Sequence, residues 1–157
     1  MANFGRSRLP VDPLVLDLNG DGVKLTGYTE NAVLFDIDND GALEETGWVS
    51  AEDGLLVRDL NNNGKIDNIS EVFSEYYGGR AGRDGESGEK HFRNGFEALR
   101  SLDSNHDGLF NERDSGFAQV RVWKDKNQNG ITDSEELFDL KSLGITEINL
   151  AYKEKRR

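Results

Sequence analysis

One short pattern recurs along the chain and constrains its fold more than any other feature. An apolar residue or two followed by D-x-[DN]-x-[DN]-G occurs five times in 157 residues. Repetition of this kind indicates that local units of one type organise the fold. Carboxylate and amide oxygens at alternate positions before a glycine turn suit hard cations such as calcium. The pattern therefore predicts a domain built around metal-binding loops.

The fifth copy, loop 5 (residues 125–136), fits the whole EF-hand loop pattern. In such a loop the side chains at the first, third and fifth positions converge on the ion, and the seventh residue offers its main-chain carbonyl. The ninth residue binds directly or through water, and a glutamate at the twelfth closes the shell with two oxygens. The predicted ligands of loop 5 are Asp125, Asn127, Asn129, Ile131, Asp133 and Glu136.

Loops 4 and 3 depart from this pattern at the closing position. Loop 4 (residues 103–114) has an aspartate there, and this shorter side chain reaches an ion more easily with one oxygen than with two. Its predicted ligands are Asp103, Asn105, Asp107, Leu109, Asn111 and Asp114. Loop 3 (residues 59–71) has Ser70 at the twelfth position and Glu71 one residue later, so its closure requires a slightly longer loop. Its predicted ligands are Asp59, Asn61, Asn63, Lys65, Asp67 and Glu71.

Loop 1 (residues 17–28) and loop 2 (residues 36–47) have the ligand-rich front half but no acid at the twelfth position. Either Glu44 or an acid from elsewhere completes loop 2, or both loops are bare turns, because Asp, Asn and Gly also dominate ordinary hairpin turns. Five copies in one acidic chain favour calcium over bare turns. The predicted ligands are Asp17, Asn19, Asp21 and Val23 in loop 1, and Asp36, Asp38, Asp40 and Ala42 in loop 2.

The charge of the chain supports several bound calcium ions. Thirty acidic residues against nineteen basic ones give a formal charge of -11. Because loop carboxylates repel one another without metal, we expect the metal-free chain to be partly unfolded and calcium binding to drive folding. Nucleic acid is not expected as a partner, since the basic cluster is confined to the tail, and no apolar run is long enough for a membrane span. The chain has no cysteine, which excludes disulfides, and we expect a monomer.

The apolar patterns predict an α+β domain of short antiparallel strands and a few helices, organised by EF-hand-like calcium loops. Strand-like runs cover residues 14–18, 33–37, 55–60, 120–124 and 145–152, and helical spacing covers 71–77, 96–102 and 135–143. We expect one calcium-binding domain over 13–152 with a mobile glycine-rich loop at 78–95, a flanking segment at 1–12 and a basic tail at 153–157. A helix enters only loop 4, which disfavours a sensor of the calmodulin type.

The Asp12-Pro13 bond lies just before loop 1 and is chemically special. The Asp12 carboxylate can attack the main-chain carbonyl of the same residue to form a cyclic anhydride, while the prolyl nitrogen leaves once it is protonated. A nearby metal ion could polarise that carbonyl. The alternative is that Pro13 only enforces an extended entry into the first strand.

Five phrases of the sequence together resemble the self-processing module of Frp-type RTX proteins. They are DPLVLDLNGDG (12–22), FDIDNDG (35–41), TGWVSAEDGLLVRDLNNNGKID (46–67), NGFEALRSLDSNHDG (94–108) and VRVWKDKNQNGITDSEEL (120–137). The resemblance implies export by type I secretion, to the outside of the cell or its surface, through a signal outside this segment. It also implies that the module cuts its own Asp-Pro bond when calcium binds. Carried onto this chain, Asp12-Pro13 is the scissile bond, and the freed aspartyl end can form an isopeptide bond with a lysine amine of another protein.

Two functions therefore remain open. The first is a calcium-triggered self-processing module, which cleaves itself and is not a turnover enzyme. The second is a non-catalytic, calcium-stabilised structural or binding module of an RTX adhesin or exported enzyme. The Asp12-Pro13 junction favours the first, whereas the end of the chain at Arg157, earlier than in the family module, favours the second.

Overall fold

The computed structural model describes residues 13–16, 25–26, 33–46, 48–82, 86–133 and 135–150. All of its regular elements are short. The strands are β1 (Val15–Leu16), β2 (Leu25–Thr26), β3 (Val33–Phe35), β4 (Glu44–Thr46), β5 (Trp48–Val49), β6 (Gly54–Arg58), β7 (Leu109–Asn111), β8 (Val120–Trp123), β9 (Leu137–Asp139) and β10 (Glu147–Asn149). The α-helix is α1 (Gly95–Arg100), and 3-10 turns span Ile69–Glu71, Phe117–Gln119 and Lys141–Leu143.

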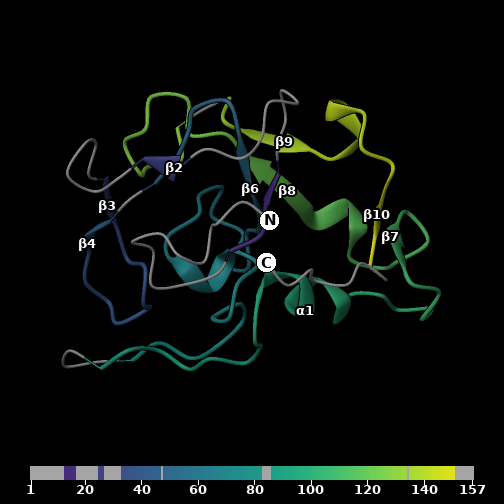
Figure 1. The fold of residues 1–157 in the computed structure, drawn as a ribbon, viewed down its shortest axis with the longest axis horizontal. Helices are drawn as coiled ribbons and strands as arrows, with labels where there is room; N and C mark the ends of the chain where they lie inside the picture. Colours follow the sequence, from purple (N-terminus) through teal and green to yellow (C-terminus); the bar gives the residue numbers. More distant parts are fainter. Residues whose placement is uncertain are drawn as a thin grey trace.

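An antiparallel sheet of order β1-β6-β8-β9 forms the centre of the fold (Figure 1). The inner strands β6 and β8 have the sequences GLLVR and VRVW, which are almost continuously apolar. Such runs are typical of strands that are covered on both faces. The register pairs Leu55 with Trp123 and Leu56 with Val122. Because successive side chains of a strand point to opposite faces, these two pairs lie on opposite faces of the sheet.

Two hydrophobic cores use these alternating residues. The first core takes Leu55 and Trp123 from the sheet and includes Ile37 of loop 2 together with Ile66 and Ile69 of loop 3. The second core takes Leu56 and Val122 from the sheet. It also includes Ala98 and Leu99 of α1, Phe110 of loop 4, and Phe73, Tyr77, Phe117, Val120, Leu140 and Leu150. The loops are thus anchored in different cores.

Three two-stranded antiparallel ribbons flank the sheet: β2 with β5, β3 with β4, and β7 with β10. The ribbon of β3 and β4 encloses loop 2, and β7 forms the rear part of loop 4. In Figure 1, β3 and β4 lie at the left end of the molecule, whereas β7 and β10 lie at the right end. An isolated two-stranded ribbon is marginal in water, so these short ribbons depend on the cores and loops that they join.

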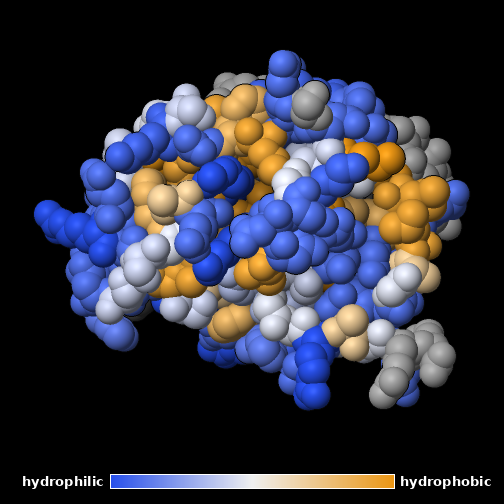
Figure 2. Space-filling model, turned by 180° about the vertical axis from the view of Figure 1, so that it is seen from behind, coloured by the Kyte–Doolittle hydropathy of each residue, from blue (hydrophilic) through white to orange (hydrophobic). Residues whose placement is uncertain are grey.

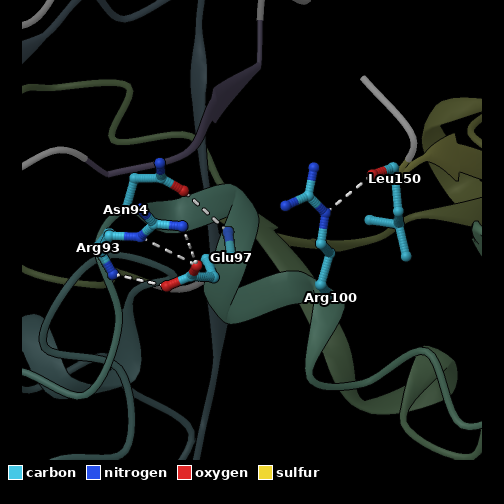
Figure 3. Close-up of polar contacts among 5 residues, drawn as sticks. All are labelled: Arg93, Asn94, Glu97, Arg100 and Leu150. Carbon is cyan, nitrogen blue, oxygen red and sulfur yellow. Dashed lines mark hydrogen bonds and ion pairs between the residues drawn. The ribbon is translucent and has the colours of Figure 1, made fainter. Parts of the chain in front are cut away.

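The helix predicted at residues 96–102 is confirmed as α1, which runs into loop 4. Asn94 caps it, because Asn94 Oδ1 accepts a hydrogen bond from Glu97 N at 2.9 Å. The Glu97 carboxylate also accepts a bond from Arg93 N at 2.9 Å and pairs with the Arg93 guanidinium at 3.2 Å. At the other end, Arg100 Nε donates to Leu150 O at 2.9 Å (Figure 3). The helix is therefore tied to the segment that follows β10.

The helices predicted at residues 71–77 and 135–143 are wrong. After the 3-10 turn Ile69–Glu71, the residue Val72 is extended and forms a bridge with Val57 of β6. The second segment contains β9, which pairs with β8, and then a 3-10 turn. In both places the sheet supplies partners for the main chain, and this tertiary pairing overrides the helical spacing of the apolar residues.

The five predicted strand regions contain β1, β3, β6, β8 and β10. The strands β2, β4, β5, β7 and β9 were not predicted, since two or three residues, such as EET in β4, are too few to show a period. The fold is therefore mostly short antiparallel strands with one short helix in the described residues. The described part of the predicted loop 78–95 contains no helix or strand apart from Gly95, which begins α1, and the mobility of this loop stays a prediction. The segment 1–12 and the tail 153–157 lie outside the described residues.

The face shown in Figure 2 is mostly hydrophilic, with hydrophobic residues gathered in patches among the polar ones. The large hydrophobic residues that are exposed include Leu43, Leu60 and Ile131, which belong to loops 2, 3 and 5. In the part of the chain that the structure describes, no helix has the length and hydrophobicity needed to cross a membrane.

Candidate metal centres

Loops 2 to 5 can be compared directly, whereas loop 1 cannot. The predicted ligands of loop 1, Asp17, Asn19, Asp21 and Val23, lie outside the described residues, and so does Asp12. The predicted ligands of the other four loops are all described.

Loops 2 to 5 share one backbone conformation at their turn. The fourth residue of each loop has a left-handed φ between 54° and 59°, in Asn39, Asn62, His106 and Gln128. The glycine at the sixth position also has a positive φ, from 72° to 91°, in Gly41, Gly64, Gly108 and Gly130. Glycine adopts this region without the steric cost of a Cβ atom. The conformation explains why the repeated pattern ends in glycine.

The first aspartate of each loop holds this turn through two main-chain amides. One carboxylate oxygen accepts a hydrogen bond from the fifth N–H and the other accepts one from the glycine N–H, in Asp36, Asp59, Asp103 and Asp125. The side chain at the fifth position in turn accepts a bond from the seventh N–H, in Asp40, Asn63, Asp107 and Asn129. The donors are Ala42, Lys65, Leu109 and Ile131, the four residues predicted to offer a carbonyl.

In each of loops 3, 4 and 5, a carboxylate near the end of the loop bonds to two main-chain amides of the same loop. One of its oxygens accepts a hydrogen bond from the second N–H of the loop, and the other accepts one from the ninth. The distances are 2.9 and 2.8 Å for Glu71, 2.9 and 3.0 Å for Asp114, and 3.1 and 3.0 Å for Glu136. Glu71 reaches this place from the thirteenth position, as the longer loop requires. The shorter Asp114 reaches both amides as well.

Loop 2 obtains the equivalent carboxylate from its ninth position. Glu44 Oε1 accepts a hydrogen bond from Ile37 N, the second N–H of the loop, at 3.0 Å. Carboxylate oxygens of Asp36, Asp38, Asp40 and Glu44 lie within 4.8 Å of one another, close enough to hold one ion. Among the described residues, the buried Oδ1 of Asp38 has no hydrogen-bond partner. Of the alternatives left open by the sequence, the structure brings Glu44 to loop 2.

Loop 4 also gathers three carboxylates, because oxygens of Asp103, Asp107 and Asp114 lie within 4.8 Å of one another. Its Asn105 Nδ2 donates to Asp107 at 3.3 Å, and the Asn111 side chain accepts a bond from Arg113 N at 3.0 Å. Asn105 and the three aspartates therefore lie together at loop 4, whereas the Asn111 side chain bonds to the main chain two residues later.

Loops 3 and 5 resemble each other most closely. In loop 3 the amides of Asn61 and Asn63 both donate to Asp67 Oδ2, at 3.0 and 2.7 Å. In loop 5 the amides of Asn127 and Asn129 both donate to Asp133 Oδ2, at 3.1 and 3.0 Å. The third, fifth and ninth side chains thus meet in both loops.

The first and the closing carboxylate of loop 5 are buried, and both tryptophans of the chain contact them. Asp125 is 1% exposed and Glu136 is 3% exposed. Trp48 Nε1 donates to Asp125 Oδ2 at 2.7 Å, and Trp123 Nε1 donates to Glu136 Oε1 at 3.3 Å. Trp123 lies two residues before Asp125, but Trp48 is 77 residues from Asp125 in the sequence. The loop pattern carries no signal for a partner from so far away, and sequence reasoning missed it.

Burial raises the pKa of several loop carboxylates. Burial, with a smaller contribution from the charges of Asp38 and Asp40, raises the pKa of Glu44 to about 7. Burial likewise raises the pKa of Asp36, Glu71 and Asp125. The pKa of the exposed Asp40 is lowered, chiefly because the Ala42 N–H bonds to it. A charged buried carboxylate needs compensation, which a bound cation would provide.

Pro13 is buried, although Asp12 is not described. It lines a small apolar cavity with Phe35, Trp48 and Ile69 of the first core. Leu14 N donates to Phe73 O at 2.8 Å, so the main chain directly after the proline is fixed as well. Pro13 is thus held against the first core, which loops 2 and 3 help to build, and Leu14 is held by Phe73 of the second core.

Two comparisons with known proteins agree with this architecture. A family model described as the SPM domain matches residues 14–157. The chain is 49% identical over 144 residues to the iron-regulated protein FrpA of Neisseria meningitidis serogroup C. The alignment covers 91% of this chain and 12% of FrpA, so the chain spans about an eighth of the length of that relative. The resemblance to the Frp-type module is confirmed.

Proposed function

The chain belongs to the SPM domain family, and we propose that it is the calcium-binding self-processing module of an exported RTX-type protein. In this proposal calcium folds the domain, and the folded domain cleaves its own Asp12-Pro13 bond. The role of the whole parent protein is part of the proposal, since the chain corresponds to 12% of FrpA.

The observation that carries the calcium proposal is the common construction of loops 2 to 5. In each loop a carboxylate accepts the second N–H, while the first aspartate holds the fifth and the glycine N–H groups. This arrangement supports EF-hand-like sites in which both ends of the loop approach one ion.

The donor set fits calcium better than other common metals. The predicted ligands are carboxylate, amide and carbonyl oxygens, which are the hard ligands that calcium prefers. Zinc prefers cysteine and histidine, and magnesium keeps several waters and demands a more rigid octahedral shell. In loop 2 we propose Glu44 as a ligand beside Asp36, Asp38 and Asp40, because the four carboxylates meet there and Asp38 Oδ1 has no other partner among the described residues.

The cleavage proposal rests on Asp12 and Pro13. The Asp12 carboxylate oxygen forms a bond to the carbonyl carbon of Asp12, the carbonyl carbon–nitrogen bond breaks, and the prolyl nitrogen leaves with a proton. The resulting cyclic anhydride is opened by water, or by a lysine amine to give an isopeptide bond. The burial of Pro13 supports this role, because holding the leaving side of the bond restricts the orientations available for attack.

Mass spectrometry of the purified chain with calcium or with chelator tests the proposal. Calcium should release a peptide ending in Asp12 and leave a fragment that begins PLVLDLNG. Asp12→Ala removes the attacking carboxylate and should abolish cleavage while calcium-induced folding persists. If the wild-type chain binds calcium but stays intact, it is a non-catalytic calcium-stabilised module, and equal cleavage of Asp12→Ala would point to a contaminating protease.

The proposal also explains how cleavage could be delayed until export. Cytosolic calcium is too low to fill sites of modest affinity, whereas extracellular calcium reaches the millimolar range in which such modules bind. The domain would therefore fold and react only outside the cell. Magnesium should be a poor substitute in the same mass spectrometry experiment.

A further inference from the structure

Loops 3 and 5 contact each other through a buried hydrogen bond. Ile66 N, at the eighth position of loop 3, donates to Thr132 Oγ1, at the eighth position of loop 5, at 3.0 Å. Ile66 is 4% exposed and Thr132 is 6% exposed. A buried amide that loses its partner is costly, so each loop restricts the position of the other.

Loop 5 also contacts the ribbon that encloses loop 2. Trp48 of β5, which follows this ribbon two residues after the end of β4, donates its indole N–H to Asp125 Oδ2, and the same oxygen accepts the Gly130 N–H at 2.7 Å. Gly130 lies directly on β3, because a Cβ atom there would be 2.5 Å from Leu34 O. The first ligand and the glycine turn of loop 5 are both positioned by the residues around loop 2.

Loops 2 and 3 also contact each other directly. Ile69 N of loop 3 donates to Asp36 O of loop 2 at 3.1 Å. Phe35, which precedes Asp36, contacts the rings of Trp48 and Trp123 with centroid distances of 5.2 and 5.8 Å. Each of the three loops is thus connected to the other two by hydrogen bonds or by aromatic contacts inside the first core.

Loop 4 is anchored elsewhere. Phe110, its eighth residue, lies in the second core and pairs with Ile148 of β10. Leu150 N donates to Gly108 O at 2.8 Å, and Arg100 of α1 binds Leu150 O (Figure 3). Loop 4, α1 and β10 therefore form a unit of their own at the other end of the molecule (Figure 1).

We infer that loops 2, 3 and 5 bind calcium cooperatively as one unit, whereas loop 4 binds independently. This inference rests on the calcium binding proposed above. An ion in loop 5 fixes Asp125 and the turn around it, and Trp48 and Thr132 transmit that order to loops 2 and 3. A later ion then meets loops that are already ordered and binds more tightly. Trp48 and Thr132 are positioning residues, since they act on the loops through Asp125 and Ile66.

The glycine amides allow each loop to be observed separately. Gly41, Gly64, Gly108 and Gly130 each donate to the first aspartate of their loop, so their amide signals in a nitrogen–proton NMR spectrum should respond to calcium in that loop. In a titration of the full chain, the signals of Gly41, Gly64 and Gly130 should change together and steeply. The Gly108 signal should follow its own curve.

Disabling loop 5 gives the first test. Glu136→Gln should raise the calcium midpoints at Gly41 and Gly64 by about fivefold or more, the range of ordinary coupling energies. The Gly108 midpoint should stay unchanged. Unchanged midpoints at Gly41 and Gly64 would overturn the coupling. If no glycine signal responds to calcium in the wild-type chain, the calcium proposal itself fails, which is a distinguishable result.

Thr132→Val gives a milder test for the case that Glu136→Gln does not fold. It removes the oxygen that accepts the Ile66 N–H but retains the branched shape, and it leaves the predicted ligands in place. The Gly64 and Gly130 curves should separate, with the Gly64 midpoint raised about fivefold. Thr146→Val, at an exposed position between loop 5 and β10, is the matched control and should leave all four curves unchanged. Curves that remain superimposed in Thr132→Val would contradict a role for this contact.

Discussion

At the scale of single residues, the position of the closing acid is less constrained than the loop pattern implies. Glu136 and Asp114 act from the twelfth position, Glu71 from the thirteenth and Glu44 from the ninth, yet each accepts the second N–H of its loop. Side-chain length and local backbone path compensate for the differences in spacing. The hydrogen bond from the second N–H of the loop therefore identifies the closing carboxylate better than its position in the sequence does.

Glu71 rather than Ser70 should be essential for calcium binding in loop 3. Glu71→Gln removes the charge of this carboxylate, the proposed closing ligand, and should raise the calcium midpoint at Gly64 about tenfold or more. Ser70→Ala is the control, because the Ser70 hydroxyl bonds only to Asn68 in the described contacts. The glycine amide titration measures both variants, and an equal effect of the two would contradict the assignment.

Calcium binding in loop 2 should depend on pH through Glu44. Burial first, and nearby acids second, raise the pKa of Glu44 to about 7, above its ordinary value of 4.5. A proton on Glu44 therefore stabilises the metal-free folded state, and this contribution is lost as the pH rises through about 7. Because calcium needs the deprotonated carboxylate, the affinity at Gly41 should fall about tenfold per pH unit below that value.

Calcium titrations at mildly acidic and at neutral pH check this dependence. Glu44→Gln should weaken binding in loop 2 and flatten the pH dependence. Glu45→Gln changes the exposed neighbour on β4 and should leave both unaffected. A Gly41 midpoint that is the same at both pH values would show that the protonation of Glu44 does not compete with calcium.

At the scale of elements, the sequence predicted the strands that supply the cores and failed for segments that complete the sheet. β6 and β8 are apolar enough to be recognised alone, whereas β9 has the sequence LFD and exists because β8 offers it partners. The helical spacing of residues 71–77 was likewise overridden by pairing with β6. The helix α1, by contrast, carries its own start signal, the Asn94 cap.

Asn94→Ala should destabilise the domain by about 1 kcal/mol, the usual cost of removing a helix cap. The Asn94 side chain accepts the Glu97 N–H, and without it the first turn of α1 loses a partner. Chemical denaturation in saturating calcium measures the free energy of unfolding. Asn94→Asp keeps the acceptor and should retain most of the stability, so an equal loss in both variants would mean that the cap is not the cause.

At the scale of the whole molecule, the loops and the cores depend on each other. Ile37, Ile66, Ile69 and Phe110 are loop residues that are buried in the two cores. Sequence reasoning could propose ligand positions because their chemistry repeats at fixed spacing, and these positions stay a prediction. It could not identify Trp48 or Thr132, because their contacts with loops 5 and 3 join residues 77 and 66 positions apart. Only the folded chain brings these residues to the loops.

Removal of calcium should therefore unfold much of the domain. The four carboxylates of loop 2 lie within 4.8 Å of one another, and so do the three of loop 4. Without metal these carboxylates repel one another, and the net charge of the chain, -11, adds to the repulsion. In chelator, near-ultraviolet circular dichroism should be lost because the aromatic side chains of the first core lose their fixed packing. Calcium should restore the signal and magnesium should not. A native spectrum in chelator would contradict the dependence of folding on metal.

The contacts of the two indole groups give the chain a built-in fluorescent reporter of metal binding. Both tryptophans donate to carboxylates of loop 5, and their rings lie 5.6 Å apart. The tryptophan emission of the protein therefore comes from two chromophores that are hydrogen-bonded to a single loop. A lanthanide bound in loop 5 should luminesce strongly, because these indoles transfer their excitation energy to it. A lanthanide in loop 4, in the other half of the molecule, should luminesce much more weakly. Fluorescence midpoints will accordingly describe the unit of loops 2, 3 and 5, in whose shared core both tryptophans lie, and should not be taken as the affinity of the entire domain.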